Sequence, residues 1–198
     1  MKQISVFCGS SMGNSTEYRN AAYQLGISLA KKEIGLVYGG TKIGLMGAVA
    51  DGALSENGKV TGILPDFLKQ KEVAHPQISQ LILVSTMHER KVKMHELSDA
   101  VIALPGGFGT MEECFEMLTW GQLGLHHKPV GLLNINGFYD QLNIFLENMV
   151  NEGFLDKKNK KMLIIEDSTD TLLKKFEAYQ HPDVEKIIRE KINNAKKQ

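Results

Sequence analysis

Short apolar runs rich in β-branched residues alternate along the chain with longer segments of helical periodicity, and this alternation restricts the fold most. The runs predict strands at residues 4–8, 36–38, 60–64, 81–84, 100–104, 130–133 and 163–165. The periodic segments predict helices at residues 14–32, 45–57, 87–97, 110–124, 139–152 and 169–180. Since helices between strands cover both faces of a parallel sheet, we expect an α/β fold: a Rossmann-like, doubly wound, mainly parallel sheet of about seven strands.

Both ends of the chain carry further helix signals. Asn14, with Glu17 three residues later, has the spacing of a helix N-cap and predicts where the first helix begins. Residues 183–197 predict an amphipathic C-terminal helix, which we expect to pack on its own chain or on a subunit partner. Its apolar stripe consists of Val184, Ile187, Ile188 and Ile192.

Length and charge limit the classes of protein to consider. The 198 residues are enough for one well-buried domain and short for two, so we expect a single domain over residues 1–198. The 23 Lys and Arg residues balance the 23 Asp and Glu residues, so the formal net charge is zero. No overall basic field favours nucleic acid or a membrane surface as a partner. Any anion site must therefore be local.

The cellular location is suggested by the cysteines and by the absence of targeting patterns. Cys8 and Cys114 are far apart and form no paired framework, which fits a reducing compartment. The first apolar run is too short for a signal peptide, and no run approaches the ~20 apolar residues of a membrane span. We expect a cytoplasmic protein.

The most informative motif for function lies at residues 104–113, which read Leu-Pro-Gly-Gly-Phe-Gly-Thr-Met-Glu-Glu after a predicted strand. Its glycines allow a sharp turn and a close approach to a ligand, and the helix expected from Thr110 supplies unpaired N–H groups and a positive dipole end. A phosphate fits such a turn. Glu112 and Glu113 would repel a phosphate, so we expect one of them to take part in chemistry beside it. Thr110 and Glu113 also have capping-box spacing, which gives Glu113 an alternative, structural role.

Glycine turns follow two other predicted strands, at residues 9–11 and 39–40. If the first strand lies beside residues 100–104, the turns at 9–11 and 106–109 form opposite sides of one crevice, where doubly wound sheets bind ligands. Neither the dinucleotide fingerprint nor the P-loop pattern is complete, so NAD and P-loop ATP hydrolysis are not expected. His88 and His95 lack the H-E-x-x-H context of a zinc site.

A basic segment at residues 87–91, Met-His-Glu-Arg-Lys, begins a predicted helix. It can be a solvated surface, or Arg90 can clamp a phosphate or ribose through its planar guanidinium. The predicted helix at 110–124 is apolar over a wide arc and needs more cover than one sheet provides, which favours a homodimer. The residues of that arc are Met111, Cys114, Phe115, Met117, Leu118 and Leu123.

These segments resemble the LONELY GUY family of cytokinin riboside 5′-monophosphate phosphoribohydrolases, often labelled lysine decarboxylase-like. The family pattern P-G-G-x-G-T-x-x-E is met in full by Pro105, Gly106, Gly107, Gly109, Thr110 and Glu113. Further matches lie at residues 8–11, 44–47, 87–91, 120–124, 128–131 and 137–139. Thr41 departs from the family, which commonly has a third glycine there.

The resemblance implies a Rossmann-like homodimer that hydrolyses the N-glycosidic bond of a nucleoside 5′-monophosphate to free base and ribose 5-phosphate. It also implies that Arg90 and Glu113 are the catalytic pair. Cleavage of this bond builds positive charge on the ribose, which a carboxylate can stabilise. Nothing in the sequence resembles a pyridoxal-phosphate lysine site, so decarboxylation is not expected.

We therefore expect a small-molecule nucleoside monophosphate as the ligand, with no cofactor, no metal, no nucleic acid and no membrane partner. The residues expected to bind substrate, mainly its phosphate, are Gly9, Ser10, Ser11, Gly40, Met87, Lys91, Gly106, Gly107, Gly109 and Thr110. A non-catalytic protein that senses AMP-like nucleotides could use the same residues, and release of ribose 5-phosphate distinguishes the two functions.

Overall fold

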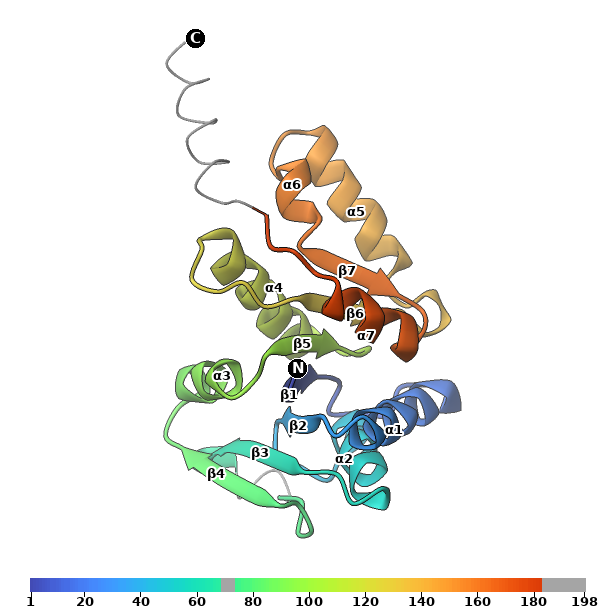
Figure 1. Ribbon diagram of the computed structural model, residues 1–198, viewed down its shortest axis with the longest axis vertical. Coiled ribbons are helices and arrows are strands. Elements are labelled where there is room, and N and C mark those ends of the chain that lie inside the picture. The colour runs from blue at the N-terminus through green and yellow to red at the C-terminus, as the bar shows by residue number, and fades with distance from the viewer. Residues whose placement is uncertain (69–73, 183–198) are drawn as a thin grey trace.

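All seven strands form one parallel sheet in the computed structural model, which describes residues 1–68 and 74–182. The strands are β1 (Gln3–Phe7), β2 (Gly35–Tyr38), β3 (Val60–Pro65), β4 (Gln80–Val84), β5 (Ala100–Ala103), β6 (Val130–Leu133) and β7 (Leu163–Glu166). Figure 1 shows their order, β4-β3-β2-β1-β5-β6-β7, from the lower edge of the sheet to the upper. The predicted fold class is confirmed.

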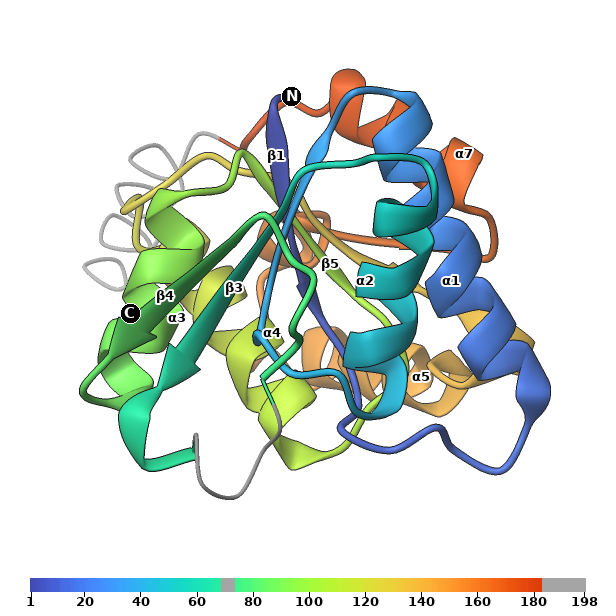
Figure 2. The same ribbon diagram turned by 90° about the horizontal axis from the view of Figure 1, so that it is seen from below.

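Helices cover both faces of this sheet, as the alternating sequence pattern predicts. They are α1 (Thr16–Lys31), α2 (Gly44–Ser55), α3 (Met87–Glu96), α4 (Phe108–Gln122), α5 (Asp140–Asn151), α6 (Lys157–Lys160) and α7 (Thr169–Glu177), with short 3-10 turns at Asp66–Leu68 and Ile135–Gly137. Buried side chains of α1, α2 and α7 form one apolar cluster with the sheet, and those of α3 and α4 belong to a second, against which the half-buried Leu142 of α5 packs. Figure 2 shows α1 and α2 on one side of the strands and α3 and α4 on the other.

The chain reverses its winding between β1 and β5. It runs from β1 outward to β4, and α3 then leads back to β5, which pairs with β1 in the register Phe7 to Ala103. The Gly9 N–H donates to the Pro105 carbonyl at 3.0 Å, so the turns after the two strands touch. The crevice expected from the sequence lies at this point.

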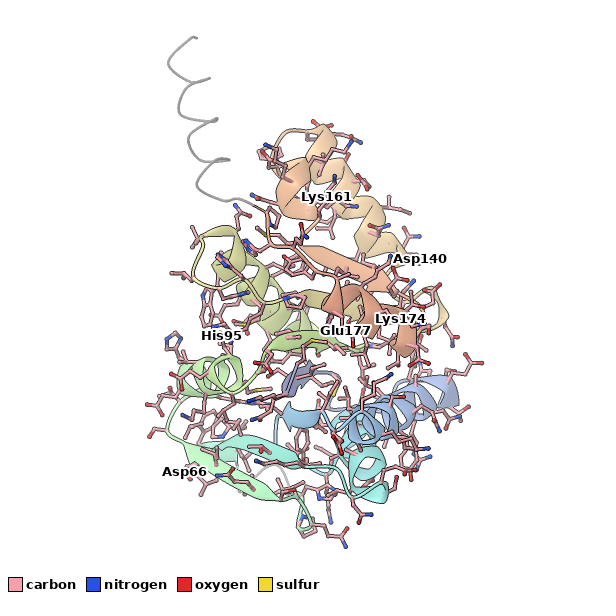
Figure 3. The ribbon with its side chains drawn as sticks, in the orientation of Figure 1. Asp66, His95, Asp140, Lys161, Lys174 and Glu177 are labelled. Carbon is pink, nitrogen blue, oxygen red and sulfur yellow. The ribbon has the colours of Figure 1, made fainter. Side chains whose placement is uncertain are left out.

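The end of β5 is held in place by the start of α5. The Tyr139 hydroxyl donates to the Leu104 carbonyl at 2.7 Å, and the Tyr139 N–H donates to Asn134 Oδ1 at 2.7 Å. Asp140, labelled in Figure 3, accepts a hydrogen bond from Asn134 Nδ2 at 2.8 Å. This network fixes the backbone immediately before the glycine turn.

Some sequence predictions differ from the structure at helix ends. The N-cap of α1 is Ser15, whose hydroxyl accepts from the Glu17 N–H at 3.2 Å, so the assignment of Asn14 is wrong by one residue. The short helix α6 has no counterpart in the prediction. The amphipathic helix predicted at 183–197 lies outside the described residues. Within residues 1–68 and 74–182, no helix has the length and apolar character needed to cross a membrane.

Helix α1 ends in a Schellman motif with an unfavourable residue at its turning point. The Glu33 N–H donates to the Ala30 carbonyl and the Ile34 N–H to the Leu29 carbonyl, each at 2.9 Å. Glu33 therefore adopts a left-handed conformation with φ of 56°, at a position where glycine is usual. The Glu33 side chain is exposed, and no ion pair with another described residue offsets this strain.

We predict that Glu33→Gly stabilises the protein by about 0.5–1 kcal/mol and raises Tm by roughly 1–4 °C, because glycine adopts the left-handed conformation without a steric penalty. Differential scanning calorimetry measures the change. Asn57, which has φ of 56° at the same position after α2, provides a matched control. Because asparagine tolerates this conformation, Asn57→Gly should change Tm less, and an equal or smaller effect of Glu33→Gly would contradict the prediction.

Candidate active site

A cavity of about 260 Å³ opens at the carboxyl ends of the central strands. Its polar side chains are Ser10, Arg90, Thr110 and Glu113, and its glycines are Gly9, Gly39, Gly107 and Gly109. Its apolar lining consists of Val6, Phe7, Cys8, Met46, Met94 and Phe108. Residues from the turns after β1, β2 and β5 and from helices α3 and α4 therefore meet around one space.

The amino-terminal end of α4 faces this cavity. The helix begins at Phe108 and its N-cap is Gly107, which provides no side-chain hydrogen bond. The N–H groups of the first turn have no partner within the helix, and residues 107–110 all line the cavity. Four backbone donors and the positive end of the helix dipole are thus available to an anion.

The capping-box alternative for Glu113 is wrong. Because Gly107 occupies the N-cap, Thr110 lies inside the first turn of α4 and Glu113 lies well inside the helix. A glycine is a competent N-cap, and the tight turn before it fixes the helix start earlier than the Thr-x-x-Glu spacing suggests. The Glu113 side chain points into the cavity rather than back to the helix terminus.

Gly107 and Gly109 are not required by the packing of the protein itself. A Cβ atom built on either glycine would have no neighbour within 4 Å, and neither residue has a positive φ. A side chain at these positions would instead occupy space beside the helix N-terminus. The glycines therefore leave room for a ligand to approach the backbone N–H groups.

Glu113 is a buried carboxyl group with an unusual proton affinity. It is 8% exposed and accepts no hydrogen bond within the described ranges. Burial raises the pKa of Glu113 to about 7; Arg90 and Lys91 counteract this rise, whereas Glu112 and Glu116 add to it. Near neutral pH, the group is divided between its protonated and ionised forms, as is common for catalytic carboxyls.

Arg90 supplies an unpaired positive charge to the same cavity. Its side chain is 7% exposed, and no carboxylate in the described parts of the chain lies within ion-pair distance of it. Nη1 contacts the Met87 sulfur at 3.9 Å, and the buried Nε has no hydrogen-bond partner. Burial of a guanidinium without a counter-charge is unfavourable, because the lost hydration is not replaced, so this site favours an anionic ligand.

The Arg90 guanidinium occupies space that a side chain at Gly39 would fill. A Cβ atom on Gly39 would lie 2.1 Å from Arg90 Nη2 and 2.7 Å from the Met46 sulfur. Gly39 therefore determines where the guanidinium rests. The sequence identifies the turn at 39–40, but it cannot reveal this contact.

The structure brings together seven of the predicted site residues, namely Gly9, Ser10, Arg90, Gly107, Gly109, Thr110 and Glu113. The others do not line this cavity. Ser11 and Gly106 line an adjoining cavity beside Tyr18 and Phe138. Met87 contacts the guanidinium, as described above, and Gly40 is a buried residue with φ of 85° in the neighbouring turn.

Lys91 also lies away from the cavity lining. Its Nζ atom is 2.5 Å from Glu112 and 3.1 Å from Glu116. Burial disfavours the charged form of Lys91, but these bonds to carboxylates outweigh it and raise its pKa. Lys91 is thus already paired with two carboxylates.

Sequence reasoning missed several lining residues. Cys8 and Met46 fall within the matching segments at residues 8–11 and 44–47, but nothing in those segments assigns their side chains to a site, and Met94 carries no signal that distinguishes it from a core position. Phe108 also lines the cavity and is 98% exposed. Its position between the glycines of the motif is a signal from which a place at the site could have been predicted. Within the described residues, no group of three or more His, Cys, Asp or Glu side chains could hold a metal ion.

The protein is a Rossmann-like α/β protein in which the open N-terminus of α4, Arg90 and Glu113 surround one cavity where the winding of the sheet reverses. The chain belongs to the family described as "Possible lysine decarboxylase", whose model matches residues 46–176, and within it to the LONELY GUY group expected from the sequence. No lysine of the described residues lines the cavity. A decarboxylase that uses pyridoxal phosphate needs a lysine to bind it, so this site does not support the family's label.

Curated relatives match almost the whole chain. The chain is 44% identical over 197 residues to cytokinin riboside 5′-monophosphate phosphoribohydrolase LOG2 of Arabidopsis thaliana, covering 98% of this chain and 92% of that protein. It is 44% identical to LOG1 of the same plant, covering 96% of this chain and 89% of that protein.

Solved structures share the fold. The X-ray structure of TM1055 has a TM-score of 0.70 and 25% identity, covering 90% of this chain and 100% of that one. A molybdenum cofactor binding protein from Rippkaea orientalis has a TM-score of 0.68 and 24% identity, covering 89% of this chain and 96% of that one.

We predict that Glu113→Gln raises Tm above that of the wild type at high pH. The rise of the pKa from 4.5 to about 7 means that the folded state disfavours the charged form, so stability is lost as pH increases through this range. Ionisation of the buried Glu113 carboxyl lowers the free energy of unfolding by at most about 3 kcal/mol above pH ~8, and by nothing below pH ~4.5.

Thermal unfolding monitored by circular dichroism should show Glu113→Gln more stable at pH ~8.5, by up to roughly 6–12 °C, with the difference disappearing near pH ~4.5. Glu96→Gln provides a control, because Glu96 is exposed on α3 and should change stability by less than about 0.5 kcal/mol. A Glu113→Gln variant that is no more stable than the wild type at high pH would show that the carboxylate carries no burial penalty.

Proposed function

We propose that this protein hydrolyses the N-glycosidic bond of nucleoside 5′-monophosphates, including cytokinin nucleotides, and releases the free base and ribose 5-phosphate. The observation that carries the proposal is the juxtaposition of buried Arg90, buried Glu113 and the open terminus of α4 around one cavity. The phosphoribohydrolase activity for which relatives 44% identical over nearly the full chain are named supports it.

The terminus of α4 is the proposed site of the 5′-phosphate. The N–H groups of residues 107–110 can donate to phosphate oxygens, and the Thr110 hydroxyl lies in the same lining. Gly107 and Gly109 leave the approach open, as described above. Arg90 would neutralise the phosphate or bind the ribose hydroxyls, which fixes the sugar within the cavity.

With the phosphate held there, the Glu113 carboxylate is the proposed stabiliser of the reacting ribose. The bond between the anomeric carbon and the base nitrogen breaks, and its electron pair leaves with the base. Positive charge develops on the ribose and is stabilised by the ionised form of Glu113. Water supplies a hydroxyl to the anomeric carbon and a proton to the departing base.

We also propose that the chain acts as a single domain in a cytoplasmic homodimer. All seven strands belong to one sheet, and both cysteines are buried and free, which suits a reducing compartment. One protomer leaves apolar side chains of α3, α4 and the following loop exposed, an arrangement that favours a protein interface. They are Met87, Phe108, Leu123 and Leu125.

We predict that monophosphates are far better substrates than the matching ribosides. Binding energy from the non-reacting phosphate aligns the anomeric carbon, so its removal should lower kcat/KM by at least ~10²-fold and reduce kcat as well as affinity. The measurement is release of base and ribose 5-phosphate from AMP, prenylated AMP and their ribosides. Equal cleavage of ribosides would exclude α4 as the phosphate site.

The same assay with Glu113→Gln tests the chemical role of the carboxylate. Turnover should fall by at least ~10²-fold, the usual effect of losing one charge-stabilising group. If the wild type binds AMP but releases no ribose 5-phosphate, the protein is a nucleotide sensor rather than a hydrolase. Retention of activity in EDTA is expected, and its loss would contradict a metal-independent reaction.

The dimer prediction is tested with two exposed phenylalanines. Phe108 lies in the proposed interface, whereas Phe154, 89% exposed, follows α5 and serves as the control. Light scattering at micromolar concentration should give a dimer for the wild type and Phe154→Ser, and a larger monomer fraction for Phe108→Ser. A fully active monomeric wild type would refute the assembly.

A further inference from the structure

Lys91, Glu112 and Glu116 form an ion cluster between the two helices that carry the proposed catalytic pair. Lys91 follows Arg90 on α3, and Glu112 and Glu116 flank Glu113 on α4. The Lys91 Nζ atom lies 2.5 Å from Glu112 and 3.1 Å from Glu116. We call these three residues the inter-helix triad.

The triad differs from an ordinary surface ion pair. The side chain of Lys91 is only 11% exposed and that of Glu116 is 21% exposed, whereas Glu112, at 55%, lies at the solvent edge of the cluster. By contrast, Lys93 and Glu96 form a 3.1 Å pair within α3 in which the side chains are 40% and 54% exposed. An exposed pair within one helix contributes little, whereas a shielded cluster between helices is less screened by solvent.

We propose that the inter-helix triad is a positioning device for the hydrolytic site: it ties α3 to α4 beside Arg90 and Glu113 and sets the charge around the Glu113 carboxyl. This rests on the proposed function of the same site. Lys91 accordingly acts through Glu113 and not as a ligand of the substrate phosphate.

The triad carries two negative charges and one positive charge beside Glu113. Glu112 and Glu116 raise the pKa of Glu113, and Lys91 lowers it, in addition to the larger effects of burial and Arg90. The charged and titratable groups around Glu113 are Arg90 and Lys91 on α3, Glu112, Glu116 and Cys114 on α4, and Cys8 after β1. The two thiols are neutral, because burial raises the pKa of each far above physiological pH.

Helices α3 and α4 have a second contact, which should keep variants of the triad folded. His95, labelled in Figure 3, lies one turn beyond Lys91 and packs edge-on against Trp120 of α4, with ring centroids 5.4 Å apart. Loss of the triad therefore leaves the aromatic packing in place. Its effects should be confined to the part of the helices nearest the cavity.

The test uses opposite charge changes, since general loosening of the helices cannot produce opposite effects. Carbon-13 NMR would follow the titration of the Glu113 carboxyl in the full, substrate-free protein, with Glu113→Gln used to assign its signal. The titration midpoint should move to lower pH in Glu112→Gln and Glu116→Gln and to higher pH in Lys91→Met. Lys91→Arg, which keeps the charge, and Glu96→Gln, which alters only the pair within α3, should stay close to the wild type.

The pH profile of AMP hydrolysis provides a second readout. If ionised Glu113 is the active form, the ratio of kcat/KM at pH ~6 to that at pH ~8.5 should rise about twofold in Glu112→Gln and fall about twofold in Lys91→Met. Shifts in the same direction, or no shifts, would overturn the proposal. An unchanged Glu113 titration in Lys91→Met, with a large increase in the KM of AMP, would identify Lys91 as a phosphate ligand and also overturn it.

The experiments distinguish a failure of the proposed hydrolase function from a failure of the triad proposal. A wild-type protein that releases no ribose 5-phosphate would reject the hydrolase. Opposite shifts of the Glu113 titration in that same protein would still support the triad as the group of residues that controls this carboxyl.

Discussion

The pairing of β1 with β5 is the constraint on which the site depends. These strands are adjacent in the sheet although more than 90 residues separate them in the chain, and the Gly9 to Pro105 hydrogen bond joins the turns that follow them. The pairing fixes where α4 begins and therefore where its free N–H groups point. On its other edge β1 pairs with β2, which brings the turn at Gly39 beside the guanidinium carried by α3. The order of the strands thus brings together the segments that line the cavity.

Arg90 and Glu113, the two buried ionisable groups of the site, lower the stability of the folded protein while serving its proposed function. Arg90 has no counter-ion among the described residues, and Glu113 is held partly protonated by its surroundings. Each is unfavourable in the folded protein until a ligand of suitable charge is present. An unpaired guanidinium can bind an anion without first breaking an existing ion pair, and a carboxyl that ionises near neutral pH can respond to a developing positive charge. In the proposed mechanism, the unfavourable burial of these two groups would therefore favour both the binding and the reaction of the substrate.

The sequence predicts the architecture because strands and helices are local patterns. All seven strands lie within two residues of their predicted bounds, and the expected meeting of the turns at Gly9 and Gly107 is confirmed. The errors at the starts of helices arise because two neighbouring residues can each serve as the N-cap. Ser15 caps α1 in preference to Asn14, and Gly107 takes the N-cap of α4 before Thr110 can do so.

The sequence is less informative about contacts between segments. It places Lys91 next to Arg90 in a basic motif, but the partners of Lys91 come from α4, more than 20 residues later. The space that Gly39 leaves for the Arg90 guanidinium likewise depends on tertiary structure, because Gly39 follows β2 and Arg90 lies on α3. Such pairings follow from tertiary packing, which periodicity and motif spacing do not encode.

Gly107 and Gly109 illustrate what different kinds of selection can detect. Alanine at either position meets open space and needs no unusual backbone conformation. At the N-cap position Gly107, alanine would still lower stability, because glycine caps a helix better than alanine does. At Gly109, inside the first turn, helix propensity favours alanine, so a library screened for expression or thermal resistance would let this position drift. The persistence of Gly109 under mutagenesis would therefore distinguish selection for activity from selection for the fold.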